Sequence, residues 1–279
     1  MSAFPQLHFT SEMDWTSLFG VPYMAASLIF TPIHLRILYV FLAKKEYRQN
    51  RCYQIMIQMQ IITCVLCPLH LFLGCSITFK SDMWGITQRS YDFSDFNFLT
   101  LTALDVILAF NRLTVIFGFS YARCFDLAVQ ICIWVLAIFF MFLAVFHLTG
   151  FQFGPNYLIL IPDMNLPWES YYIVYVNYYR LGCTLITLFC YVYIFTRLVI
   201  RKAKTGHSGV CYNEKETLLY ALTRFLGELV SVVFVQIAVW LQLHGVDEGV
   251  LQGFAQSIEY MLLVHYVCLP PVLLLILNK

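Results

Sequence analysis

The chain has 279 residues, of which 60% are hydrophobic and only 12% carry a charge, and its mean hydropathy is +0.73. Soluble domains carry about a quarter charged residues, so this composition excludes an ordinary water-soluble protein and indicates an integral membrane protein. The formal net charge is +1, and we expect no nucleic-acid partner.

Residues 1–17 contain no basic stretch and no small-residue cleavage site, so we expect no signal peptide. Seven apolar stretches follow, each long enough for a helix that crosses a bilayer, which takes about 20 residues. They cover residues 18–42, 52–77, 96–120, 127–149, 170–199, 217–243 and 253–277. The sequence therefore predicts an all-α membrane protein in which residues 1–279 form a single seven-helix transmembrane domain.

The charges between these stretches predict the orientation in the membrane. Lysine and arginine concentrate in the first, third and fifth linkers, whereas the amino-terminal segment and the other linkers are mainly acidic. The basic linker residues are Lys44, Lys45, Arg48, Arg51, Arg123, Arg201, Lys202, Lys204 and Lys215. Because positive charge favours the cytoplasmic side, we expect the N-terminus outside and the C-terminus inside.

The third stretch carries a full charge close to its end, in the run ILAFNRLTVIFGF at residues 107–119. In the predicted orientation, Arg112 lies about two turns from the cytoplasmic end of this helix. A long basic side chain at that depth can reach water at the interface. Taken alone, Arg112 is explained by a topological anchor.

Three local patterns carry a resemblance to nematode serpentine chemoreceptors, particularly their class T and class X branches. Residues 108–112 read LAFNR, similar to the family's Leu-Ala-x-Asn-Arg at the inner end of helix three. Residues 50–56 read NRCYQIM, similar to the stretch that opens helix two, and residues 271–279 read PVLLLILNK, similar to the helix-seven ending. Pro32 and Trp134 also fall where such receptors often carry these residues.

The resemblance implies a bundle of the rhodopsin-like G-protein-coupled receptor type in the plasma membrane, including that of sensory cilia. It implies a chemosensory receptor with a small-molecule ligand in the extracellular half and a heterotrimeric G protein inside, with no enzymatic activity and no cofactor. Pro271 matches the helix-seven switch, but Pro270 and Leu274 replace its asparagine and tyrosine. Residues 85–95 and 151–170 lack cysteine, so the usual outer disulfide cannot form, and residues 217–243 lack the usual proline. A degenerate, non-signalling receptor is therefore an alternative.

Charged residues inside membrane spans are costly and are candidates for function. The charged residues deep in the predicted spans are Arg36, Asp105, Arg180, Arg224, Glu228 and Glu259. We predict that the ligand-binding residues are Asp105, Tyr175, Tyr178, Tyr179, Arg180 and Glu259. The alternative is that the charged groups pair with one another without a ligand. The i,i+4 spacing of Arg224 and Glu228 favours an intrahelical ion pair.

Basic side chains at the inner face form a second candidate site. We predict that G-protein coupling involves Asn111, Arg112, Arg123, Arg201, Lys202 and Lys204. Attraction of these charges to anionic lipid is a competing explanation, at about 1 kcal/mol per charge.

The sequence gives less support to other classes of protein. A transporter or ion channel is an alternative, but we find no internal repeat, and the prolines show no symmetrical placement. The histidines show no paired spacing for a catalytic metal, so we predict no metal site. We expect His147 and His265 to be packed core residues, and the ten cysteines to be small buried side chains.

Overall fold

The computed structural model describes residues 15–82, 85–118, 123–153, 160–205, 212–244 and 248–277. Residues 1–14, on which the signal-peptide prediction rests, lie outside this part. The helices are η1 (Trp15–Gly20), α1 (Val21–Ala43), α2 (Lys45–Gln49), α3 (Arg51–Phe79), α4 (Ile86–Phe117), α5 (Arg123–Val145), α6 (Glu169–Thr205), α7 (Tyr212–Leu243), α8 (Glu248–Leu263), the π-helical turn η2 (Val264–Cys268) and α9 (Leu269–Leu277).

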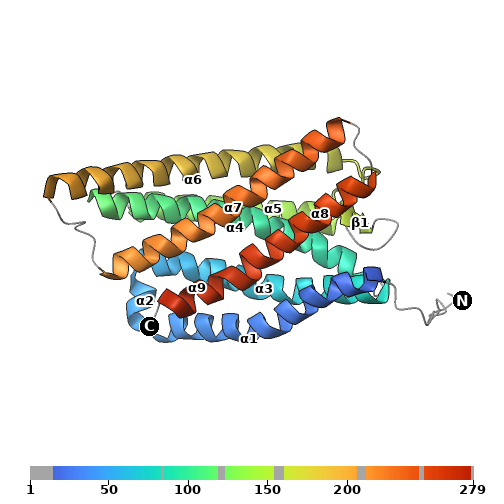
Figure 1. The fold of residues 1–279 in the computed structure, drawn as a ribbon, viewed down its shortest axis with the longest axis horizontal. Coiled ribbons are helices and arrows are strands. Elements are labelled where there is room, and N and C mark those ends of the chain that lie inside the picture. The colour runs from blue at the N-terminus through green and yellow to red at the C-terminus, as the bar shows by residue number, and fades with distance from the viewer. Residues whose placement is uncertain are drawn as a thin grey trace, which may run out of the picture.

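Seven helices in the described ranges are long and apolar enough to cross a membrane. They are α1, α3, α4, α5, α6, α7 and the rod formed by α8, η2 and α9, and they pack side by side in one bundle (Figure 1). η1 and the end of α9 lie at opposite ends of this bundle, as an odd number of crossings requires (Figure 1). Since hydrocarbon offers the backbone no hydrogen bonds, each span satisfies its own as a helix.

Helix α4 is the most buried of the seven spans and begins about ten residues earlier than predicted. Gly85, with φ of +80°, precedes its first turn, and the Asp82 carboxylate accepts a hydrogen bond from the Gln88 amide at 3.0 Å. Partial burial raises the pKa of Asp82. The predicted start of this span at residue 96 was therefore too late, because polar residues extend the helix back to Ile86, beyond the apolar stretch.

A hairpin joins α5 to α6. Its strands β1 (Phe151–Phe153) and β2 (Leu160–Pro162) are antiparallel, with Phe151 opposite Pro162. The Asp92 carboxylate of α4 accepts a hydrogen bond from the Phe151 amide at 2.9 Å, and the Glu169 carboxylate of α6 accepts one from the Gly150 amide at 2.8 Å. Two carboxylates therefore hold the hairpin through hydrogen bonds to its backbone.

Replacing Asp92 with alanine is expected to release the start of the hairpin. A hydrogen bond to a charged acceptor contributes about 1.5–3 kcal/mol, so amide exchange at Phe151 should accelerate by roughly ten- to a hundredfold. Hydrogen–deuterium exchange with mass spectrometry measures this. The matched control is Asp163→Ala, whose carboxylate accepts from the Asn165 amide at 3.1 Å in an exposed turn. Equal exchange at Phe151 in both variants would contradict the role of Asp92.

Candidate functional site

An ion pair between two helices lies deep inside the bundle. The Arg224 Nε of α7 donates a hydrogen bond to the Asp105 Oδ1 of α4 at 2.8 Å, and both side chains are almost fully buried. The guanidinium also lies over the Tyr266 ring, 5.7 Å from its centroid. Each charge thereby has a partner of opposite sign on another span, which lowers the free-energy cost of its burial.

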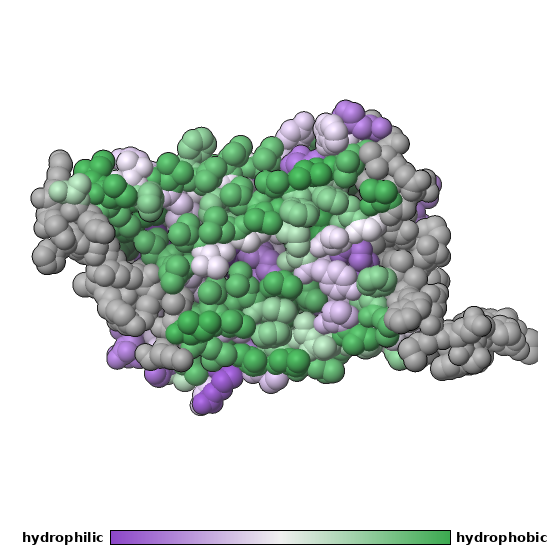
Figure 2. Space-filling view, in the orientation of Figure 1, coloured by the Kyte–Doolittle hydropathy of each residue, from purple (hydrophilic) through white to green (hydrophobic). Residues whose placement is uncertain are grey.

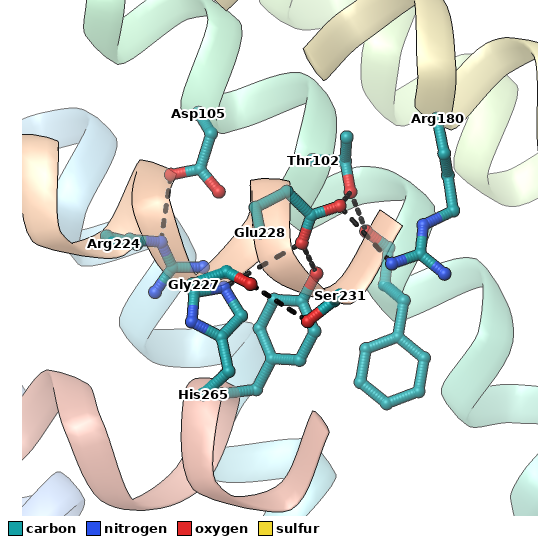
Figure 3. Close-up of polar contacts among 10 residues, drawn as sticks. Thr102, Asp105, Arg180, Arg224, Gly227, Glu228, Ser231 and His265 are labelled. Atoms are coloured by element: carbon teal, nitrogen blue, oxygen red, sulfur yellow. Dashed lines mark hydrogen bonds and ion pairs between the residues drawn. The ribbon is translucent and has the colours of Figure 1, made fainter. Parts of the chain in front are cut away.

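Glu228, one turn further along α7, is the centre of a second set of contacts (Figure 3). Its carboxylate accepts hydrogen bonds from the Thr102 hydroxyl at 3.0 Å, from an Arg180 guanidinium nitrogen at 3.3 Å, and from the Tyr266 hydroxyl. The His265 Nε2 lies 3.7 Å from the same carboxylate. We call Thr102, Arg180, Glu228, His265 and Tyr266 the Glu228 network.

The predicted intrahelical pair between Arg224 and Glu228 was wrong. Within the described part of the chain, Arg224 pairs with Asp105 and Glu228 with Arg180. A buried carboxylate gains more from several donors on surrounding helices than from one neighbour on its own helix. The alternative that charged groups of different spans pair with one another therefore describes these four residues.

The remaining predicted ligand-binding residues lie in different surroundings. The Glu259 carboxylate of α8 accepts a hydrogen bond from the Tyr91 hydroxyl of α4, apart from the Glu228 network. Tyr175 stacks on the half-buried Tyr179, with ring centroids 5.8 Å apart. Tyr178 is 72% exposed on α6, so it does not share the helix face of Tyr175 and Tyr179. Successive residues on a helix point about 100° apart, which accounts for the difference.

The end of α4 that carries Asn111 and Arg112 is more enclosed than predicted. Arg112 is only 6% exposed and Asn111 is also buried, so the arginine does not reach water at the interface. The side chains of the other predicted coupling residues, Arg123, Arg201, Lys202 and Lys204, lie outside the described part of the structure.

Pro271 has a structural consequence in the seventh span. A proline has no N–H, so it cannot donate to the Val267 carbonyl four residues earlier. His34 of α1 donates from Nε2 to that carbonyl at 2.8 Å, and Gln60 of α3 hydrogen-bonds the other ring nitrogen. This assignment makes His34 neutral, with its proton on Nε2. The Val267 carbonyl, which the proline leaves without a backbone donor, thus links the seventh span to α1, and His34 extends the link to α3.

Two predictions about histidines had different outcomes. His265 is buried as expected, whereas His147 is exposed at the end of α5 with φ of +53°, so its prediction as a core residue was wrong. No group of three potential metal ligands occurs among the residues that the structure describes.

Comparisons with known proteins support the fold. No protein-family model and no curated protein sequence matches the chain. The solved structure of squid rhodopsin is similar over 98% of this chain and 85% of that chain, with a TM-score of 0.68 and 13% sequence identity. The chain is therefore an integral, multi-pass membrane protein with the rhodopsin-like seven-helix fold. At this identity the likeness concerns the fold alone.

Proposed function

We propose that the protein is a chemosensory G-protein-coupled receptor of the serpentine type, located in the plasma membrane. A small ligand in the extracellular half would shift the arrangement of the helices, and the inner face would report that shift to a heterotrimeric G protein. Three lines of support are the rhodopsin-like fold, the expected orientation and the Asn111–Arg112 pattern.

The Glu228 network is the observation that carries this proposal. Its members come from α4, α6, α7 and η2, so a group that displaces Arg180 changes contacts in four helices at once. A ligand can shift an equilibrium only through its differential affinity for the two states. Arg180 is the part of the network nearest the outer half, and we propose it as a ligand contact together with Tyr175, Tyr179 and Glu259. We propose Asp105, which Arg224 neutralises, as the floor of this pocket.

A signalling assay tests the proposal. Cells that express the receptor with a G-protein biosensor are screened with a panel of small water-soluble chemical stimuli. Any agonist response should fall by at least about tenfold in Arg112→Ala, a loss within the usual range of coupling energies. Arg36→Ala is the matched control, since Arg36 is an exposed arginine near the inner end of α1 that lies over the Tyr39 ring at 5.6 Å.

The outcomes separate the alternatives. An unchanged response in Arg112→Ala, with surface expression retained, would contradict the coupling role of Arg112. A protein that reaches the surface but activates no G protein with any stimulus would favour a degenerate, non-signalling receptor. Ion or solute flux in proteoliposomes without a G protein would favour the transporter or channel reading.

A further inference from the structure

A groove of about 500 Å³ lies between α7 and the π-helical part of the seventh span. Gly227, Val230 and Ser231 line it on α7, and Val264 and His265 line it on η2. This volume falls within the range of sites that bind small molecules. All of these residues lie within the membrane-spanning parts of their helices, so the groove is at the depth of the hydrocarbon.

The groove opens sideways toward lipid. Three of its lining residues, Leu226, Val230 and Val264, are between 44% and 55% exposed. Figure 2 shows this face of the bundle, where the surface over α7 and α8–α9 is mainly hydrophobic and hydrophilic residues appear in the strip between them. A molecule enters such a groove from the bilayer, and charged molecules are therefore disfavoured.

A polar side chain lies at the floor of this apolar groove. His265 is 4% exposed, and neither of its ring nitrogens has a hydrogen-bond partner in the described structure. A buried polar group without a partner costs about 1–3 kcal/mol, so a partner supplied by a ligand is favourable. Its Nε2 faces Glu228 at 3.7 Å, and its Nδ1 lies against Gly227 of α7, so a ligand hydroxyl donates to Nδ1 when the ring turns from Gly227 toward the groove.

Gly227 brings this ring against the backbone of α7 (Figure 3). A Cβ at position 227 would lie 2.1 Å from the His265 Nδ1, so any larger residue would force the ring to move. Ser231 donates its hydroxyl hydrogen to the Gly227 carbonyl at 2.9 Å and keeps a lone pair for a further donor. The lining thus offers hydrogen-bond acceptors and lacks a charged side chain.

We propose that this groove binds an uncharged, lipid-soluble molecule whose apolar body lies between α7 and η2 and whose single hydroxyl donates to His265. Long-chain alcohols and sterols have this chemistry. The site is separate from the pocket proposed for the soluble ligand and does not depend on signalling. Because His265 also faces Glu228, an occupant contacts the network from the lipid side.

Photolabelling of the purified protein in lipid nanodiscs tests this site. The probe is hexadecanol carrying a diazirine, and hexadecane carrying the same diazirine is its matched analogue without the hydroxyl. The alcohol should label peptides from α7 and residues 260–269, and excess unlabelled hexadecanol should suppress that labelling. One net hydrogen bond predicts a preference for the alcohol over the alkane of roughly fivefold.

Matched variants define the outcome. Val230→Trp fills the groove and should abolish the saturable labelling, whereas Val233→Trp, on a lipid-exposed residue of the same helix outside the lining, should leave it unchanged. His265→Phe should remove the preference for the alcohol and retain labelling by the alkane. Labelling that is not saturable, or that is equal in Val230→Trp and Val233→Trp, would mean ordinary lipid contact and would overturn the proposal.

Discussion

Replacing Asp105 with leucine is expected to lower the free energy of unfolding by about 3–5 kcal/mol, because it leaves the buried Arg224 guanidinium without its counter-charge. The pair is held by a hydrogen bond of 2.8 Å between side chains that are 2% and 7% exposed. The double variant Asp105→Leu/Arg224→Met should recover most of the loss, since two well-packed apolar side chains can replace a buried ion pair at little cost.

Thermal unfolding of the purified variants in detergent measures this cycle. Glu46→Leu is the control, because Glu46 is an exposed acid on the short helix α2 and its loss should change stability by less than about 0.5 kcal/mol. A loss below about 1 kcal/mol for Asp105→Leu would show that Arg224 finds other partners. A double variant no more stable than the single variant would show that packing, rather than charge, governs this position.

Replacing His34 with phenylalanine should destabilise the protein by about 1–3 kcal/mol, the usual cost of leaving a buried carbonyl without a donor. The carbonyl concerned is that of Val267, which cannot receive a backbone hydrogen bond from Pro271. Pro271→Leu supplies the missing N–H within the same helix. It should therefore offset a measurable part of the loss when combined with His34→Phe.

The same unfolding assay compares the two single variants with the double variant. His244→Phe is a matched control, because the His244 ring also bonds a backbone carbonyl, that of Trp240 at 2.8 Å, but in an exposed position. It should have little effect. Strictly additive effects of His34→Phe and Pro271→Leu would show that the histidine and the proline act independently.

The fold class follows from the sequence because hydrocarbon dictates it. Spans of about 20 apolar residues have to be helical, and seven of them pack into a bundle whatever the details of their side chains. Hydropathy predicts the helix ends less well than the number of helices. The first turns of α4 are polar, and its cap involves Asp82 and Gly85, neither of which stands out in a hydropathy pattern.

The partners of the buried charges could not be read from spacing. Arg224 and Glu228 have a spacing that suits an intrahelical pair, yet each has its ion-pair partner on another helix, Arg224 on α4 and Glu228 on α6. Which partner lies nearest depends on the packing of all seven helices. Hydropathy was nevertheless informative, since four of the six charged residues that it picked out inside apolar spans, Asp105, Arg180, Arg224 and Glu228, form the two buried ion pairs.

The carboxylates that hold the hairpin between α5 and α6 have a consequence for the handling of the protein. All eight cysteines that the structure describes are free thiols, and the contacts of Asp92 and Glu169 with the hairpin do not depend on oxidation. The hairpin should therefore keep its position during cell-free synthesis with a thiol reductant present. A cysteine introduced on the hairpin could then carry a fluorophore that follows motion at this end of the bundle, without a native bridge to reshuffle.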